Sequence, residues 1–147
     1  MLRYTASVKK IIIYTDGGAR GNPGPAGIGA VIADEKGKTL KEISEYIGEA
    51  TNNFAEYEAL IRAFEAAREL FGEKLKDMAI EVRMDSELIV RQMQGAYKVK
   101  EPALKEQFAR VGQLVGALQN ISFTHVTREK NAHADELVND AIDKAGK

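Results

Sequence analysis

Two aspartates stand at the ends of apolar segments, where a solvated acid is not expected. Asp16 closely follows an Ile-Ile-Ile run at 11–13, and the glycine-rich stretch GGARGNPGPAGIG begins directly after it. Asp85 likewise ends the segment AIEVRMD. If the two segments are neighbouring parallel strands, they deliver both carboxylates to the same edge of the sheet, where α/β proteins bind ligands. An unpaired carboxylate at the edge of a core is costly, so these positions favour a binding or catalytic site.

Two further acids lie on the apolar sides of expected helices. On the helix expected over 52–71, Glu56 continues a stripe of Ala, Leu and Phe side chains spaced three and four residues apart, whereas Glu58 lies on the polar side. On the last expected helix, 132–145, Asp135 has the same spacing relative to the apolar residues that follow it. Glu56 and Asp135 are therefore predicted to point toward the sheet.

Four carboxylates that meet at one edge repel one another unless divalent cations neutralise them. The chain has no cysteine, and oxygen ligands alone suit the hard ions Mg²⁺ and Mn²⁺ rather than zinc. A single metal site therefore explains the positions of all four acids. Structural alternatives stay open at this point, because Asp85 also suits the first turn of a helix and Asp16 suits a turn.

The hydrophobic pattern indicates the elements that must position these acids. Strands are expected at 9–16, 27–34 and 38–47, and the turn Glu35-Lys36-Gly37 predicts that the last two form a hairpin. These three strands are predicted to be antiparallel. The remaining elements are expected in the order helix 52–71, strand 78–85, helices 86–94 and 102–119, strand 121–126 and helix 132–145. Strands separated by helices indicate parallel pairing, so the predicted class is α/β with a mixed sheet flanked by helices.

Length and composition limit the class of protein further. The 147 residues are expected to form a single domain, 1–147, with an N-terminal tail at 1–8. No segment approaches the roughly 20 apolar residues of a membrane span, and the N-terminus has no apolar core of signal-peptide length. We therefore expect a cytoplasmic protein with no membrane partner. The net charge of −1 excludes a strongly basic body, so a polyanionic partner would need a local basic patch.

Four blocks of the chain together resemble type 1 ribonuclease H. The blocks are DGGARGNPGPAGIGAVI, TNNFAEYEAL, MDSELIVRQMQGAYKVK and REKNAHADELVNDA, which lie in order within roughly residues 9–143. The resemblance implies a five-stranded mixed sheet, with three antiparallel strands followed by two parallel ones. It also implies endonucleolytic cleavage of the RNA strand of RNA–DNA hybrids to 5′-phosphate products, with two Mg²⁺ ions, replaceable by Mn²⁺. Its catalytic and metal-binding residues would be Asp16, Glu56, Asp85 and Asp135.

The same resemblance suggests residues that contact the substrate. A loop without side chains at Gly17 lets the sugar-phosphate backbone approach, and a backbone group there could read the 2′-hydroxyl that distinguishes RNA from DNA. Asn52 and Asn53 would contact the minor groove, while Thr51 and Asn22 would bind a phosphate of the DNA strand. Helix capping is an equally good interpretation of Asn52. Ser86 completes the Asp-Ser pair, although Glu87 follows it where relatives commonly have glutamine.

The chain departs from the family pattern in the segment before the last acid. Many relatives have a histidine there, whereas this segment reads Thr-Arg-Glu-Lys-Asn. Arg128, Glu129 or His133 is expected to take over its auxiliary role, and exposed surface is the alternative for His133. The basic and aromatic insertion of some relatives is nearly absent, so hybrid binding is expected to be sensitive to salt.

Competing functions stay open on sequence alone. A catalytically silent nucleic-acid-binding module of the same fold is one alternative, although the presence of all four acids argues against it. Additional cleavage of double-stranded RNA is a second. A transposase core or exonuclease would place acids similarly but lacks the TNN-x-x-E block. We expect a monomer that acts on an RNA–DNA hybrid.

Overall fold

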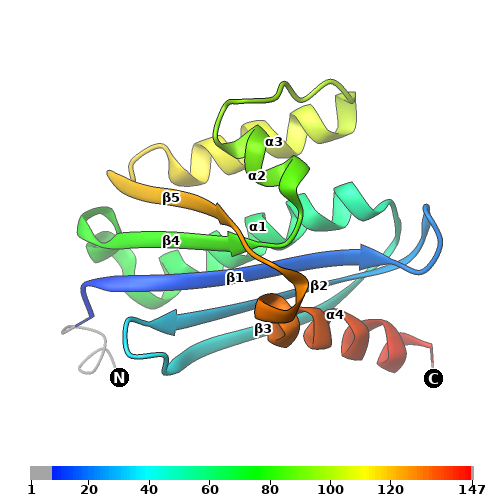
Figure 1. The fold of residues 1–147 in the computed structure, drawn as a ribbon, viewed down its shortest axis with the longest axis horizontal. Helices are drawn as coiled ribbons and strands as arrows, with labels where there is room; N and C mark the ends of the chain where they lie inside the picture. The colour runs from blue at the N-terminus through cyan, green and yellow to red at the C-terminus, as the bar shows by residue number, and fades with distance from the viewer. Residues whose placement is uncertain (1–7, 147) are drawn as a thin grey trace.

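Strand β1 (Lys10–Ala19) lies in the middle of a five-stranded sheet, as its continuous apolar run predicts. The structure is a computed structural model and describes residues 8–146; residues 1–7 of the expected tail lie outside the described residues. The strand order is β3-β2-β1-β4-β5 (Figure 1). The other strands are β2 (Gly24–Asp34), β3 (Thr39–Ala50), β4 (Ala79–Met84) and β5 (Asn120–His125).

The pairing of the strands confirms the predicted mixed sheet. Strand β2 runs antiparallel to β1, and β3 runs antiparallel to β2. Strand β4 is parallel to β1, and β5 is parallel to β4. The β2–β3 turn contains Gly37 at φ 89°, and Asp34 accepts hydrogen bonds at Oδ1 from the backbone N–H groups of Lys36 and Lys38. The hairpin predicted from the turn Glu35-Lys36-Gly37 is thus confirmed.

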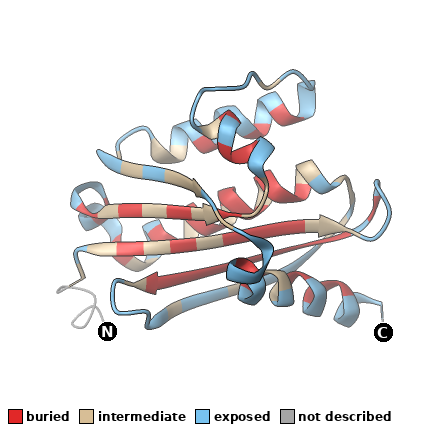
Figure 2. Ribbon diagram, in the orientation of Figure 1, coloured by how far each residue is buried: buried red, intermediate tan, exposed pale blue. Residues whose placement is uncertain are grey.

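Helices cover both faces of the sheet. The α-helices are α1 (Asn52–Phe71), α2 (Glu87–Met93), α3 (Pro102–Val115) and α4 (Ala132–Ala145), and the 3₁₀ helices are η2 (Gly72–Asp77) and η3 (Arg128–Asn131). The main core lies between the sheet and α1 and includes Ile11, Ile13, Leu60 and Phe64 (Figure 2). Helix α4 packs on the opposite face, across β2 and β3. Within residues 8–146, no helix is long and apolar enough to cross a membrane.

The glycine-rich stretch differs from its expected form as a loop after Asp16. Strand β1 continues past Asp16, and Gly17 pairs with Ile28 and Gly18 with Gly27 of β2. The reason is close packing of helices on the sheet. A Cβ at Gly17 would lie 2.3 Å from the backbone C and O of Ala55 in α1, and one at Gly29 would lie 2.2 Å from the backbone O of Ala134 in α4. Glycine at these two positions lets α1 approach β1 and α4 approach β2, which brings Glu56 and Asp135 close to Asp16.

Gly17→Ala is expected to lower the free energy of unfolding by about 1–3 kcal/mol or more, because the added methyl group must displace helix backbone rather than a side-chain end. Thermal melting measures this loss. Gly112→Ala is the matched control, since a Cβ at this α3 position meets nothing within 4 Å. The control is expected to leave stability unchanged or raise it slightly. Equal melting temperatures for the two variants would contradict this account of the glycines.

Candidate active site

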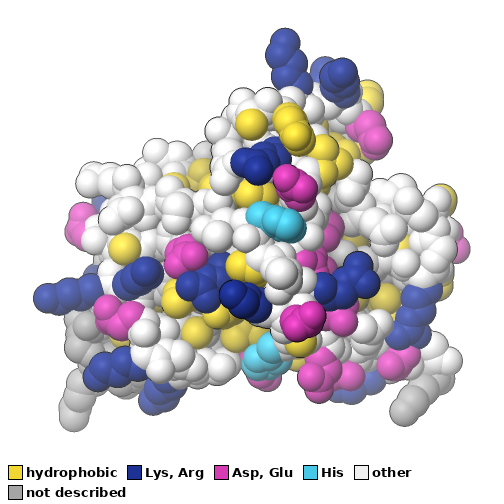
Figure 3. Space-filling model, in the orientation of Figure 1, with side chains coloured by type: hydrophobic (Ala, Val, Ile, Leu, Met, Phe, Trp, Pro, Cys, Tyr) yellow, Lys and Arg dark blue, Asp and Glu magenta, His cyan; other side chains and the backbone are white. Residues whose placement is uncertain are grey.

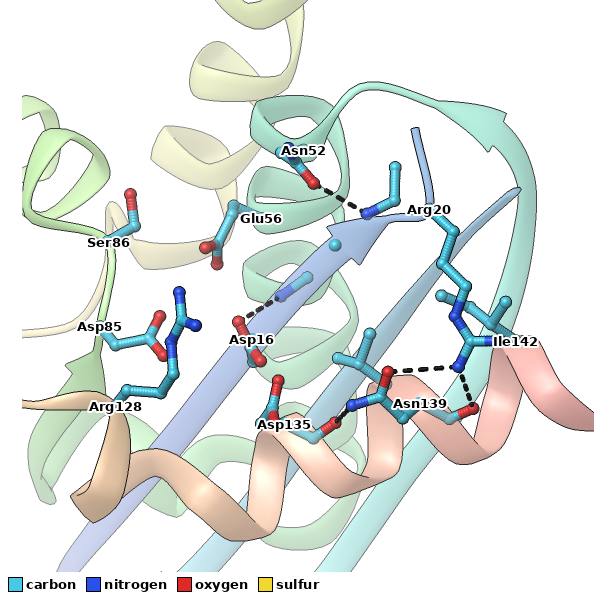
Figure 4. A pocket seen from close by; sticks show the side chains of 14 residues that line it. Asp16, Arg20, Asn52, Glu56, Asp85, Ser86, Arg128, Asp135, Asn139 and Ile142 are labelled. Carbon is cyan, nitrogen blue, oxygen red and sulfur yellow. Dashed lines mark hydrogen bonds between the residues drawn. The ribbon is translucent and has the colours of Figure 1, made fainter. Parts of the chain in front are cut away.

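Four acidic side chains line one cavity of about 410 Å³ at the edge of the sheet (Figure 4). Asp16, Glu56 and Asp85 each offer a carboxylate oxygen, and these oxygens lie within 4.8 Å of one another. Asp135 lies beside Asp16 in the same cavity (Figure 4), and its proximity contributes to the raised pKa of Asp16. The four acids singled out in the sequence therefore meet in one place.

The fold explains why each acid arrives there. Strands β1 and β4 are parallel neighbours whose last paired residues are Thr15 and Met84, so Asp16 and Asp85 follow at the same level. Glu56 lies on the buried side of α1, which comes close to β1 over Gly17. Asp135 is in the first turn of α4. Two strand positions and two helix faces thus place the acids around one point.

Burial sets the charge state of the acids. Asp16 is 7% exposed, and burial, followed by the neighbouring Asp85 and Asp135, raises its pKa to about 8, although the Gly17 N–H donates to its Oδ1 at 3.0 Å. Burial, and then Asp16 and Asp85, also raises the pKa of Glu56 well above its ordinary value. Burial raises the pKa of Asp85, and the nearby Arg128 guanidinium opposes this shift. The cluster therefore favours protons or cations.

The residues present fit hard divalent cations. Glu56 Oε1 is buried and has no hydrogen-bond partner within residues 8–146, and the Glu56 carboxylate lies beside those of Asp16 and Asp85. Carboxylate oxygens are the ligands that Mg²⁺ and Mn²⁺ prefer. Asp16, Glu56, Asp85 and Asp135 are thus the residues that would hold such ions.

Polar residues near the start of α1 tie this helix to the β1–β2 turn. The N-cap is Thr51, whose Oγ1 accepts a hydrogen bond from the Phe54 N–H at 3.1 Å. Asn52 does not cap the helix. Its Oδ1 accepts from the Ala19 N–H at 2.8 Å, and its own backbone N–H donates to Asn22 Oδ1 at 2.9 Å. Asn52 lines the acid cavity, while Thr51 and Asn22 lie outside its lining.

The remaining predicted contact residues occupy two places. Ser86 lines the acid cavity and caps α2, where its Oγ accepts from the Ile89 N–H at 3.4 Å. Asn53 lines a neighbouring groove together with Tyr97, Lys98 and Lys100. Gly17 lies in the wall of the acid cavity.

The three auxiliary candidates are separated in space. Arg128 lines the acid cavity next to Asp85 (Figure 4). Glu129 is exposed and outside the lining of this cavity. His133 lies on the side of α4 that faces β3, and its Nε2 is 2.5 Å from Glu42 Oε2. Only Arg128 of the three therefore reaches the acids.

Sequence reasoning missed two residues of this region. Asn131 is buried and its Nδ2 donates to the Thr15 carbonyl at 2.9 Å, beside Asp16, and the nearby Asn131 side chain opposes the rise in the pKa of Asp85. Its place directly before the expected helix 132–145 gave no signal for this contact. Arg20 lines the cavity from the β1–β2 turn. A single cation within a glycine-rich stretch was the signal that could have identified it.

Comparisons with known proteins agree with this geometry. Residues 14–141 match the family described as reverse transcriptase-like. A ribonuclease HI of Halobacterium salinarum is 43% identical over 92% of this chain, and a bifunctional protein of Mycobacterium tuberculosis is 43% identical over the same share. This chain spans 66% of the length of the first protein and 36% of the second.

Solved structures are also similar along their full length. LC11-RNase H1, isolated from compost by a metagenomic approach, is 70% identical with a TM-score of 0.91, covering 95% of this chain and 100% of that one. The same protein in complex with an RNA/DNA hybrid aligns with a TM-score of 0.89 at 70% identity, over 93% of this chain and 99% of that one. The RNase H1 of Halobacterium salinarum has a TM-score of 0.84 at 42% identity, over 92% of this chain and 98% of that one.

Proposed function

This chain belongs to the type 1 ribonuclease H family, and from that premise we propose that it hydrolyses the RNA strand of RNA–DNA hybrids. The observation that carries the proposal is the meeting of Asp16, Glu56 and Asp85 within 4.8 Å in an open cavity. The hybrid complex of the 70% identical LC11-RNase H1 supports the choice of substrate. A silent binding module would have no use for buried carboxylates that repel one another.

The proposed hydrolysis depends on divalent cations bound by the four carboxylates. Two Mg²⁺ ions, or Mn²⁺ in their place, would supply a nucleophilic water and stabilise the departing 3′-oxygen, which leaves a 5′-phosphate product. Asp16, which lies next to Asp85, Glu56 and Asp135, would hold these ions together with the other three carboxylates. The Gly17 N–H keeps the Asp16 carboxylate oriented through its hydrogen bond to Oδ1. The cavity is open, so a strand can reach these oxygens from solvent.

Selection of RNA would come from residues beside the acids. Asn52 is held by the Ala19 N–H at its Oδ1, and no partner within residues 8–146 accepts from its Nδ2. This amide can therefore donate to an acceptor in the minor groove or to a 2′-hydroxyl. We assign Gly17 and Asn53 to contacts with the same groove, Ser86 to the neighbouring nucleotide, and Thr51 with Asn22 to a phosphate of the DNA strand.

A comparison of labelled substrates tests this function. RNA–DNA hybrid, double-stranded RNA and double-stranded DNA, each labelled at the 5′ or 3′ end, are incubated with Mg²⁺, Mn²⁺ or a chelator. The hybrid is expected to be cut within its RNA strand, only with metal, to products that end in a 5′-phosphate. Cleavage of double-stranded RNA as well would add a second substrate. Metal-dependent cutting of DNA alone would reject the proposal.

Arg128→Ala is expected to lower kcat on the hybrid by about 10-fold, because the variant loses a cation beside Asp85 where charge changes during the reaction. Initial rates at saturating hybrid measure this loss. His133→Ala is the matched variant, since His133 pairs with Glu42 outside the acid cavity, and it is expected to keep kcat within about 2-fold. The opposite ranking of the two variants would assign the auxiliary role to His133.

A further inference from the structure

The acid cavity has a second part that the proposed chemistry does not use. It runs between the β1–β2 turn and α4, and its lining residues are Gly18, Ala19, Arg20, Val138, Asn139 and Ile142 (Figure 4). Arg20 supplies the positive charge of this part, and small or apolar side chains form much of its wall. A strand of nucleic acid lying over the carboxylates has room to continue here.

Arg20 is held in place from one side. Its Nη1 lies 2.6 Å from Asp143 Oδ1, and its Nη2 donates to the side-chain and backbone oxygens of Asn139 at 3.3 and 3.5 Å. The Arg20 and Asp143 side chains are 47% and 56% exposed, so water weakens this ion pair. A guanidinium has five N–H donors in a planar fork, so Arg20 keeps donors for a second anion.

The backbone that carries Arg20 is also well fixed relative to the acids. Arg20 follows Asp16 by four residues on the same strand and turn, and its N–H donates to the Pro25 carbonyl at 2.9 Å. Asn52 holds the preceding residue through the Ala19 N–H. The backbone position of Arg20 relative to Asp16 is therefore set before any substrate binds, which limits the entropy cost of a contact to that of the side chain.

The distribution of charge around the cavity makes Arg20 important for binding a polyanion. The chain has a net charge of −1, and the face shown in Figure 3 mixes Lys and Arg with Asp and Glu rather than presenting a continuous basic band. Four carboxylates in the cavity add repulsion toward a polyanion. Among the described side chains that line the cavity, Arg20 and Arg128 are the cationic ones, and Figure 4 shows the acids between them.

We propose that Arg20 binds a phosphate of the RNA strand close to the scissile linkage, on the side of the acids opposite Arg128. This inference rests on the function proposed above and adds a residue that positions the substrate. Phosphate contacts fix the register of a nucleic acid on a protein. Arg20 thus keeps the scissile phosphate over the carboxylates as the strand passes through the cavity.

A purely structural role for Arg20 makes a different prediction. If Arg20 only anchors α4 to the β1–β2 turn, loss of either partner of its ion pair with Asp143 weakens folding and leaves hybrid binding alone. If Arg20 binds phosphate, Asp143 competes with the substrate for the guanidinium. Asp143→Asn then strengthens hybrid binding, whereas Arg20→Ala weakens it.

The test measures cleavage of an RNA–DNA hybrid with Mg²⁺ and, separately, binding of a fluorescent hybrid in chelator by anisotropy, at several salt concentrations. Arg20→Ala is expected to raise KM and Kd by about 5- to 20-fold with kcat within about 2-fold. The slope of log Kd against log salt is expected to become shallower by about 1. Arg20→Lys is expected to restore part of the loss, and Asp143→Asn to lower KM and Kd.

Arg110→Ala is the matched control, because Arg110 is also exposed and paired with a single acid, Glu65 at 2.9 Å, on the far side of α1. It is expected to change neither KM nor the salt slope. Unchanged KM, Kd and salt slope in Arg20→Ala, with a lowered melting temperature, would overturn the proposal. An increase of KM in Asp143→Asn would also overturn it. Should the wild-type chain cleave no hybrid, the binding measurement in chelator still decides the role of Arg20.

Discussion

Replacing Asp16 with asparagine is expected to lower kcat on an RNA–DNA hybrid by about 10³-fold or more. Asp16 is the carboxylate that neighbours the other three, so its loss removes charge from the centre of the site. The amide is nearly isosteric, so folding and hybrid binding are expected to survive. The measurement is a single-turnover rate with end-labelled hybrid, together with hybrid binding by anisotropy.

The control for this variant is Asp140→Asn. Asp140 is an exposed acid on α4 outside the lining of the cavity. It is expected to keep the wild-type rate, which separates the position of the carboxylate from the mere loss of one negative charge. Retention of more than about a tenth of the wild-type rate by Asp16→Asn would exclude a central catalytic role for Asp16.

Without divalent cations, the protein is expected to lose stability as the pH rises from about 4 to about 8. The pKa of Asp16 rises from 3.8 to about 8 on folding, so in this window the folded state binds a proton that the unfolded state has released. Unfolding therefore releases a proton in this window, so the free energy of unfolding falls as the pH rises. The expected fall is on the order of 2–5 kcal/mol, read from urea denaturation at several pH values in chelator.

Asp16→Asn tests the origin of this pH dependence. The variant lacks the titrating carboxylate and the repulsion it causes, so at pH 8 in chelator it is expected to melt roughly 5–15 °C above the wild-type protein. Mg²⁺ is expected to stabilise the wild-type protein by about 2.7 kcal/mol at 100 times its Kd, and the variant by less. If the free energy of unfolding of the wild-type protein rises between pH 4 and pH 8, or does not change when Mg²⁺ is added, the acids do not repel one another.

The positions of the acids could be predicted because strand and helix patterns carry the needed information. The parallel pairing of β1 and β4 follows from the helix between them, and it places Asp16 next to Asp85. The apolar stripe of α1 orients Glu56 in the same way. Each of these inferences uses a short-range pattern and one rule of topology, so none required knowledge of side-chain packing.

Features that depend on packing between distant segments could not be predicted in the same way. The role of Gly17 depends on how closely α1 approaches β1, which no local pattern reports. His133 lies two residues before Asp135, yet its side chain points to Glu42 on β3. The Arg20 guanidinium is oriented by an ion pair with Asp143, which lies more than a hundred residues away in the sequence. The acids and several residues that line their cavity were thus predictable, whereas the contacts that hold Arg20 and His133 in place were not.

The most direct test of the account is the anomalous scattering of Mn²⁺ in crystals of Asp135→Asn bound to an uncleaved RNA–DNA hybrid. Two anomalous peaks are expected at the remaining carboxylates Asp16, Glu56 and Asp85, with a phosphate of the RNA strand beside them. Peaks confined to other surfaces, or hybrid seated on a face away from this cavity, would contradict the claim that these carboxylates bind the cations that cleave RNA.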